Sequence, residues 1–182
     1  MVKTAEIKEQ KVKIPENVQI TFENNKLTVT GEKGSISKVF SHPNINLKVN
    51  GKENIILKCK SSRRKDKALL GTFIAHIKNM IKGVTEGFEY KMKTVFSHFP
   101  IKTSVEGEKF VIQNFLGERA ARTARILEGV TVEAKGENIT VQGVDKEKVG
   151  QTVANIERAT KVKYRDIRIF QDGIYRISKG GS

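Results

Sequence analysis

The second half of this chain repeats the order of residue patterns found in the first half, and this duplication limits the folds that are possible. Each half begins with two pairs of short segments in which apolar and polar residues alternate, as in half-buried β-strands. Turn residues such as Asn24-Asn25, Asn50-Gly51, Gly107 and Lys135-Gly136 separate the segments of a pair, so each pair is predicted to form a β-hairpin. The segments are residues 18–22, 26–30, 45–49 and 54–57 in the first half, and 103–105, 110–112, 130–134 and 138–141 in the second.

After the hairpins, each half changes from a two-residue period to the 3.6-residue period of an amphipathic helix. In the first half we expect Ser61 or Ser62 to cap the helix and Gly83 or Gly87 to end it. The expected apolar stripe of this helix consists of Leu69, Phe73, Ile77, Met80, Ile81 and Val84. In the second half Asp145 is the expected N-cap, and the buried face consists of Val149, Val153, Ile156 and Thr160.

The two halves align with an offset that falls from 85 residues at the first hairpin to 79 at the helix. Duplication explains this matched order, and the alternative is chance resemblance between two short patterns. The predicted fold class is α+β, with two duplicated domains that are each a small antiparallel sheet with one helix packed on one face. The first domain is expected at residues 1–93, with a short N-terminal extension and a closing strand at 88–92. The second is expected at 94–182, with a C-terminal basic segment.

One segment is ambiguous between helix and strand. Residues 118–126 are rich in Ala and Arg, which favour a helix by intrinsic propensity. Their counterpart in the first half is the expected strand at residues 35–40. We therefore expect a strand at 118–126, because tertiary context overrides weak propensity.

Composition narrows the class of protein. No apolar run approaches the ~18 residues of a membrane span, and residues 1–13 lack the apolar region of a secretory signal. The single Cys59 and three His residues make a disulfide scaffold or a structural zinc site improbable. The chain is strongly basic, with 34 Lys and Arg against 20 Asp and Glu and a net charge of +14. We expect an intracellular protein, with no membrane partner, whose charge suits a polyanion.

Catalytic signatures are absent from the sequence. There is no phosphate-binding GxxxxGK[ST] loop, HExxH or GxSxG motif. His42, His76 and His98 lie far apart with no obvious carboxylate or Cys partner, and Cys59 follows a strand as a core or edge thiol would. We therefore predict no enzyme activity, no metal and no cofactor.

Three basic clusters are the candidate RNA-binding sites. Arg forks fit phosphates, and aromatic side chains such as Tyr164, Phe170 and Tyr175 can stack on unpaired bases or pack in a core. For each cluster taken alone, the alternative to RNA binding is a charged surface that is exposed to solvent and binds nothing. The first cluster lies at the strand-to-helix turn and the third near the end of the chain. The candidate residues are Lys58, Lys60, Arg63, Arg64 and Lys65; Arg119, Arg122 and Arg125; and Lys161, Lys163, Arg165, Arg168 and Arg176.

Several motifs resemble the large-subunit ribosomal protein six family. The longest is Asn-Met-Ile-Lys-Gly-Val-Thr-Glu-Gly-Phe at residues 79–88, and Gly71-Thr72, Tyr90–Lys93 and His98–Pro100 accompany it. Residues 114–118 and 166–175 are similar to the archaeal and eukaryotic branch. The bacterial Pro-Tyr-Lys-Gly-Lys-Gly ending is absent, and Ile74 stands where bacterial sequences usually carry Arg. The likeness covers nearly the whole chain, from about residue 14 to residue 180.

This resemblance implies two similar α+β domains in a structural protein of the large ribosomal subunit, in the cytoplasm. It implies binding to large-subunit rRNA near the sarcin–ricin region and the base of the lateral stalk, where translation factors dock. It also implies contact with neighbouring ribosomal proteins, and nearby translation factors are possible partners. Family binding leans on the second domain, which favours the third basic cluster. Two alternative functions remain: a scaffold that binds acidic proteins and, less favoured, an RNA-modifying enzyme.

Overall fold

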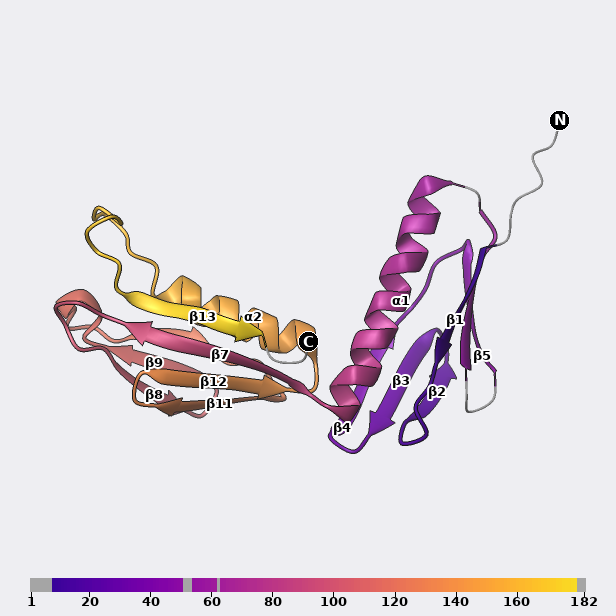
Figure 1. Ribbon diagram of the computed structural model, residues 1–182, viewed down its shortest axis with the longest axis horizontal. Helices are drawn as coiled ribbons and strands as arrows, with labels where there is room; N and C mark the ends of the chain where they lie inside the picture. Colours follow the sequence, from indigo (N-terminus) through magenta and orange to yellow (C-terminus); the bar gives the residue numbers. More distant parts are fainter. Residues whose placement is uncertain (1–7, 51–53, 62, 180–182) are drawn as a thin grey trace. The chain divides into compact units, whose positions relative to one another are not determined.

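The computed structural model describes residues 8–50, 54–61 and 63–179, and these residues form two compact units that divide between Glu86 and Gly87. Each unit has antiparallel sheets and a single long helix, which Figure 1 shows by the labels α1 and α2. The predicted α+β duplication is therefore confirmed. Each unit contains two small sheets, whereas the sequence predicted one.

The first unit consists of two three-stranded sheets and the helix α1. One sheet has the strand order β1-β6-β5 and the other has the order β2-β3-β4. The helix contacts strands of both sheets. The elements are β1 (Lys8–Lys13), β2 (Gln19–Glu23), β3 (Lys26–Gly31), β4 (Gly34–Val39), β5 (Ile45–Asn50), β6 (Asn54–Cys59) and α1 (Arg64–Thr85).

Local residue chemistry explains the first hairpin. Asn24 and Asn25 both have positive φ, at 49° and 61°, and they join β2 to β3 in register. Asn tolerates this left-handed conformation better than most residues, so the turn fixes which face of β3 is buried. Leu27 and Val29 are consequently fully buried. The turn expected at Asn50-Gly51 includes residues outside those described.

The ends of α1 differ in part from expectation. Arg63 is the N-cap, with no hydrogen bond from a side chain at the cap, although Ser61 Oγ accepts a hydrogen bond from the Arg63 backbone N–H. Ser62 lies outside the described residues. The helix ends at Thr85 and Gly87 follows with a φ of 77°, whereas Gly83 is buried within the helix. A residue after a helix often adopts this left-handed conformation, which glycine allows without strain.

The second unit combines a four-stranded sheet, a three-stranded sheet and the helix α2. The strand orders are β11-β12-β7-β13 and β10-β9-β8. Asp145 caps α2 as predicted, because its Oδ1 accepts a hydrogen bond from the Glu147 N–H at 2.9 Å. The elements are β7 (Phe88–Val95), β8 (Lys102–Glu106), β9 (Lys109–Gln113), the short 3-10 helix η1 (Phe115–Gly117), β10 (Arg122–Arg125), β11 (Val130–Lys135), β12 (Asn138–Gly143), α2 (Lys146–Ala159) and β13 (Gly173–Lys179).

The division between the units falls before β7, and not between residues 93 and 94 as expected. β7 pairs with β12 on one side and with β13 on the other, so it is a central strand of the second unit and does not close the first. Its counterpart in the first unit is β1, which pairs with β6 in the same antiparallel way. β1 falls within the region expected to be a short N-terminal extension, and Val12 is the one apolar residue of this strand.

The ambiguous segment at 118–126 contains a strand, as the duplication predicted. Only residues Arg122–Arg125 form it, and they pair with β9. Ala124 is buried while its neighbours Thr123 and Arg125 are exposed, so the side chains alternate as in a strand. Tertiary pairing with β9 thus overrides the helical propensity of Ala and Arg.

Candidate nucleic-acid interface

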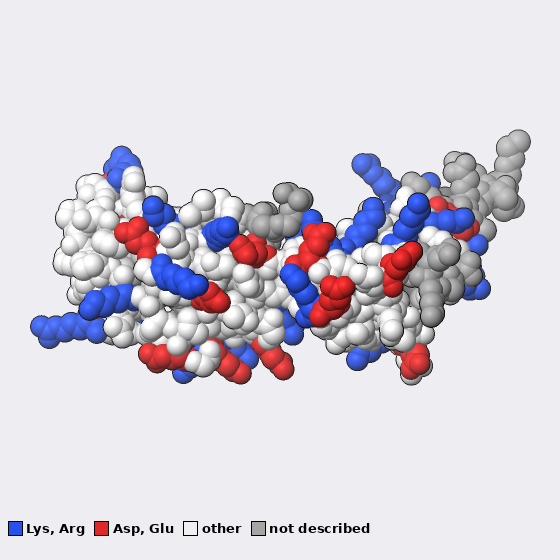
Figure 2. Space-filling view, turned by 60° about the horizontal axis from the view of Figure 1, so that its bottom comes forward, with Lys and Arg blue, Asp and Glu red and all other residues white. Residues whose placement is uncertain are grey.

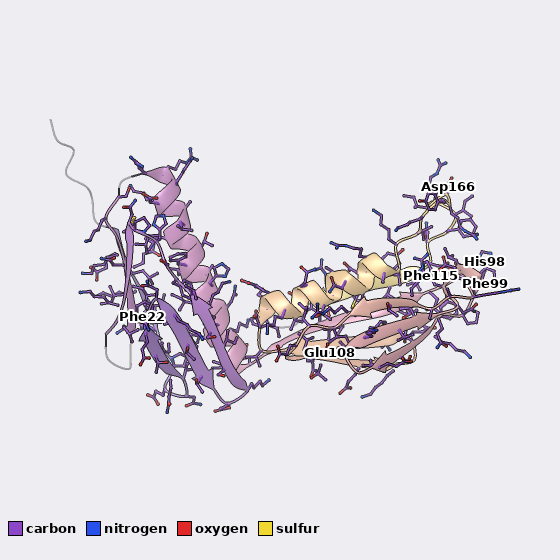
Figure 3. The ribbon with its side chains drawn as sticks, turned by 180° about the vertical axis from the view of Figure 1, so that it is seen from behind. Phe22, His98, Phe99, Glu108, Phe115 and Asp166 are labelled. Atoms are coloured by element: carbon purple, nitrogen blue, oxygen red, sulfur yellow. The ribbon has the colours of Figure 1, made fainter. Side chains whose placement is uncertain are left out.

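The third basic cluster lies on the loop of residues 160–172, which connects α2 to β13. Lys161, Lys163, Arg165 and Arg168 are all exposed on it, and Arg176 is exposed on β13. Figure 3 places Asp166 at the tip of this projecting loop, at the same end of the second unit as His98 and Phe99. Four of the five residues expected to bind RNA in this cluster are therefore gathered on one projecting segment.

Asp166 organises the tip of the loop. Its carbonyl accepts hydrogen bonds from the N–H groups of Ile169 and Phe170, and its Oδ1 accepts one from the Arg168 N–H at 3.0 Å. The Arg168 guanidinium also binds this carboxylate, with 2.8 Å between Nη2 and Oδ2. The Arg168 side chain and backbone N–H lower the pKa of Asp166, and the Asp166 carboxylate raises the pKa of Arg168. The basic loop thus has a defined shape before any partner arrives.

Apolar side chains also project from this loop. Tyr164 is fully exposed, at 103%, and has a positive φ of 59°, while Ile167 and Ile169 are about two-thirds exposed. A bulky residue with a left-handed backbone is uncommon in folded proteins and costs of order 1 kcal/mol. Phe170 does the opposite, since it packs against the core with the Arg165 guanidinium 4.8 Å from its ring centroid. The sequence analysis noted Tyr164 but did not single out Ile167 or Ile169.

Arg122, in the second cluster, is held by contacts within its own unit. Its Nη1 donates to the carbonyls of Ala159 at 2.9 Å and Lys161 at 3.1 Å, where α2 ends and the 160–172 loop begins. Its Nε and Nη2 donate to the two carboxylate oxygens of Glu118, at 2.8 and 2.6 Å. Its guanidinium also lies 4.3 Å from the centroid of the Phe115 ring. The hydrogen bond from Arg122 lowers the pKa of Glu118.

The other members of the second cluster differ from Arg122. Arg119 and Arg125 are exposed, at the two ends of the segment that contains Arg122. Arg122 joins this segment to the start of the 160–172 loop, so the second and third clusters belong to one region of the second unit.

The first cluster belongs to the other unit and surrounds the start of α1. Lys60, Arg63, Arg64 and Lys65 are exposed, whereas Lys58 is half-buried and pairs with Glu9 at 3.0 Å. A helix N-terminus presents free N–H groups and a partial positive charge, which add to this basic surface.

Asp66, in the first turn of α1, is the nearby acidic residue and is nearly buried. Its Oδ2 accepts a hydrogen bond from Asn44 at 3.0 Å, and its Oδ1 lies 3.9 Å from His42 Nε2. The sequence showed no obvious carboxylate partner for His42, and the structure places Asp66 beside it. A hydrogen bond from Ser61 is the main cause that lowers the pKa of Asp66, and Asn44, His42 and Arg63 act in the same direction against desolvation.

Charge on one face of the molecule is mixed (Figure 2). Figure 2 shows one face, on which Lys and Arg side chains lie among those of Asp and Glu with no continuous basic sheet. On this face, positive side chains are therefore dispersed among negative ones (Figure 2).

Cys59 and the His, Asp and Glu side chains bear on whether the chain has a catalytic or metal centre. Cys59 is completely buried and its thiol donates a 3.4 Å hydrogen bond to the carbonyl of Ser61, which fits the predicted core thiol. Across residues 8–50, 54–61 and 63–179, no group of three or more His, Cys, Asp or Glu could hold a metal ion. Within the same ranges, no helix has the length and apolarity needed to cross a membrane.

Comparison with known proteins identifies the duplicated fold. The family model described as Ribosomal protein L6 matches residues 14–87 and again residues 99–173, one match in each half. The chain is 50% identical over 179 residues to the large ribosomal subunit protein uL6 of Methanobrevibacter smithii, covering 98% of this chain and 99% of that one. It is 47% identical to the uL6 protein of Methanosarcina mazei, over 92% of this chain and 95% of that one. It is 49% identical to that of Ignicoccus hospitalis, over 90% of both chains.

The same family model matches both halves of this duplicated basic chain. These matches place the chain in a class of structural, non-enzymatic ribosomal proteins. The chain belongs to the ribosomal protein L6 family, and the relatives named above are all archaeal. The resemblance found in the sequence motifs, including the archaeal and eukaryotic branch, is thereby confirmed.

Proposed function

We propose that this chain is a structural constituent of the large ribosomal subunit that binds large-subunit rRNA, with neighbouring ribosomal proteins as further partners. The 160–172 loop is the principal contact, through Lys161, Lys163, Arg165 and Arg168, and Arg176 adds to it. Arg119 and Arg125 extend this surface. Lys58, Lys60, Arg63, Arg64 and Lys65 form a second contact surface on the first unit. The bound region is the one that the family resemblance implies, near the sarcin–ricin region and the stalk base, where the protein supports the area that translation factors occupy.

The gathering of basic side chains on an ordered, projecting loop is the observation that carries this proposal. Arg guanidinium groups bind phosphate oxygens through two parallel hydrogen bonds, and Lys adds a point charge. A loop whose shape is fixed by Asp166 loses little conformational entropy on binding, so more of the ionic interaction appears as affinity. Arg122 fits a supporting role, because most of its donors already bind Glu118 and the end of α2.

A salt titration tests the contact surface. Binding of purified large-subunit rRNA is measured from low to high salt for the wild type and for a variant with Lys163, Arg165 and Arg168 all changed to Ala. Each lost phosphate contact reduces the slope of log affinity against log salt by about 0.7 to 0.9. The triple variant is therefore expected to bind more weakly, with a slope smaller by about 2 to 3.

A matched control removes the same charge elsewhere in the second unit. Lys102, Lys109 and Lys135 are exposed on β8, β9 and β11, and their joint replacement by Ala also lowers the net charge by three. The proposal expects a much smaller loss of slope in this control. Equal losses in both triple variants would mean that net charge, and not the loop, drives binding.

Ribosome association is tested by sedimentation of the tagged chain from its native lysate, with and without nuclease. Stoichiometric migration with the large subunit that is lost on rRNA digestion supports the proposal. Migration at ~20 kDa, or in a nuclease-resistant complex with acidic proteins, would overturn it.

A further inference from the structure

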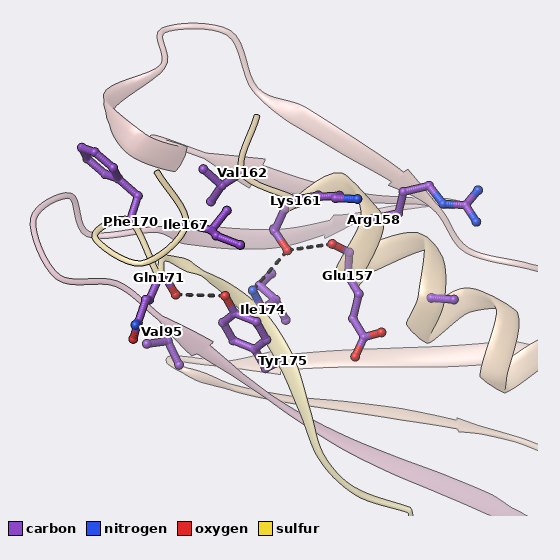
Figure 4. Close-up of a pocket in the computed structure, with 12 residues that line it drawn as sticks. Val95, Glu157, Arg158, Lys161, Val162, Ile167, Phe170, Gln171, Ile174 and Tyr175 are labelled. Atoms are coloured by element: carbon purple, nitrogen blue, oxygen red, sulfur yellow. Dashed lines mark hydrogen bonds between the residues drawn. The ribbon is translucent and has the colours of Figure 1, made fainter. Parts of the chain in front are cut away.

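A hollow of about 870 Å³ lies beside the 160–172 loop, where α2 ends and β13 begins. Its volume is in the ~300–1,000 Å³ range of ligand pockets in proteins. Figure 4 shows that α2 provides Glu157 and Arg158, the loop provides Val162, Ile167 and Phe170, and β13 provides Tyr175. The hydrogen bond from the Ile174 N–H to Thr160 Oγ1, 3.1 Å long, joins the end of α2 to β13 and so holds two walls of the hollow together.

Tyr175 lies flat at the edge of this hollow. Its hydroxyl donates a 3.0 Å hydrogen bond to the carbonyl of Gln171, which turns the ring back along its own strand. The ring then covers Gly173, where a Cβ would lie only 3.1 Å from ring atoms Cε2 and Cζ and from the hydroxyl oxygen. One face of the ring therefore rests on backbone that has no side chain. Tyr175 nevertheless remains 49% exposed, so much of its surface is open to a partner.

Charge around the hollow favours an anionic ligand with an apolar part. Arg158 and Lys161 line it and supply the positive charge. The acidic group in the lining is Glu157, whose Oε1 already accepts a hydrogen bond from the Arg176 N–H at 3.2 Å. The remaining lining includes Val95, Val162, Ile167 and Phe170, which offer apolar surface.

We propose that the hollow receives one unpaired nucleobase of the bound rRNA, which stacks on the open face of Tyr175 while Arg158 and Lys161 meet the adjoining phosphates. This inference rests on the proposed function. It adds a contact with a base to a surface that was proposed to bind only the phosphates of the RNA. Any base can stack on an aromatic ring, because every base has a π face. The site is therefore expected to recognise an unstacked nucleotide without preference for sequence. Gly173 is a positioning residue, because its missing side chain is what allows the Tyr175 ring to lie flat.

Affinity for purified large-subunit rRNA is the first measurement, and it compares variants of the full chain. Tyr175→Leu keeps an apolar side chain but removes the stacking face, and we expect roughly tenfold weaker binding with an unchanged salt slope. Tyr175→Phe keeps the ring and is expected to bind within about twofold of the wild type. Phe99→Leu is the matched control, because Phe99 is also a part-exposed ring against a glycine, Gly117, but it does not line the hollow.

Fluorescence detects base stacking directly, without comparing the affinities of the wild type and Tyr175→Leu. The chain has no Trp, so Tyr175→Trp introduces a single indole probe at the site. A five-nucleotide oligoadenylate is expected to quench this fluorescence, while an oligomer of the same length with abasic sugars is expected to quench it much less.

The outcomes separate the stacking site from the broader function. Wild-type affinity for Tyr175→Leu, an equal loss in Phe99→Leu, or equal quenching by the abasic oligomer would each overturn the stacking proposal and leave the proposed function intact. Absence of salt-dependent rRNA binding by the wild type would overturn the proposed function before any Tyr175 variant is compared.

Discussion

Arg122 provides the sharpest test of the structure, because the sequence suggested an RNA contact and the structure gives it internal partners. In Arg122→Ala, the carbonyls of Ala159 and Lys161 lose a charged donor, and Glu118 loses its ion-pair partner. A hydrogen bond to a charged group contributes about 1.5–3 kcal/mol. The Arg122 side chain is 23% exposed and that of Glu118 is 41% exposed, so we take the low end for the carbonyls and under ~1 kcal/mol for the ion pair.

These contributions together predict that Arg122→Ala lowers the free energy of unfolding of the second unit by about 3 kcal/mol. For a unit of this size each kcal/mol corresponds to about 4–8 °C in Tm, so the unit is expected to melt about 12–24 °C lower. Thermal melting measures the change, and hydrogen exchange of residues 159–170 locates it. Arg122→Lys is expected to recover only part of the loss, because an ammonium group cannot make the forked contact with Glu118.

Arg125→Ala is the control for this experiment, since Arg125 is exposed on the same strand. Its effect on unfolding is expected to stay within about 0.5 kcal/mol. If Arg122→Ala melts within about 2 °C of the wild type while its salt slope for rRNA falls by nearly one, the internal role is wrong and Arg122 is an RNA contact.

Three further predictions concern stability. Asp145→Ala removes the N-cap of α2 and is expected to cost about 1 kcal/mol, measured by denaturant unfolding. Gly71→Ala is expected to stabilise α1 by up to ~1 kcal/mol, because a Cβ there meets nothing within 4 Å, whereas Gly31→Ala places a Cβ 2.8 Å from Val84 and is expected to cost about 1–3 kcal/mol in the same assay. The pKa of Asp66 is depressed below 3.8, so its contribution to stability is present above that pH and is lost as the pH falls through the folded-state pKa. Asp66→Asn is therefore expected to lower Tm at pH 7, with a difference from the wild type that shrinks as the pH falls below 3.8; a constant difference would contradict this.

Elements with a strong local signal were predictable from the sequence. The Asn24-Asn25 turn and the Asp145 cap follow from the conformations and hydrogen bonds that these residue types favour within a few positions of themselves. The buried face of α2 followed from its period, since Val149, Val153 and Ile156 are all buried. In α1 the predicted residues Ile77, Met80, Ile81 and Val84 are buried. In the first half of the helix the prediction was wrong by one residue, because Leu70 and Ile74 are buried where Leu69 and Phe73 are only part-buried.

Features that depend on distant partners were not predictable in the same way. β1 carries four charged residues among six and becomes a strand because β6 supplies its hydrogen bonds. Asp172 is buried, and its Oδ1 accepts a hydrogen bond from the Ser97 N–H at 3.2 Å, 75 residues away in the sequence. The sequence located the three basic clusters, but it held no signal that Arg122 would face inward to Glu118 and the end of α2.

The central place of β7 has a consequence for the order in which the second unit folds. β7 gains its neighbour β13 only when residues near Val95 meet residues near Gly173, across most of the unit's length. Closing so long a loop costs entropy before any contact rewards it, so this pairing is expected to form late. The 160–172 loop is anchored at one end by β13, so it reaches its final shape at that same late step. The loop proposed to bind RNA therefore reaches its final shape only when the whole unit has folded.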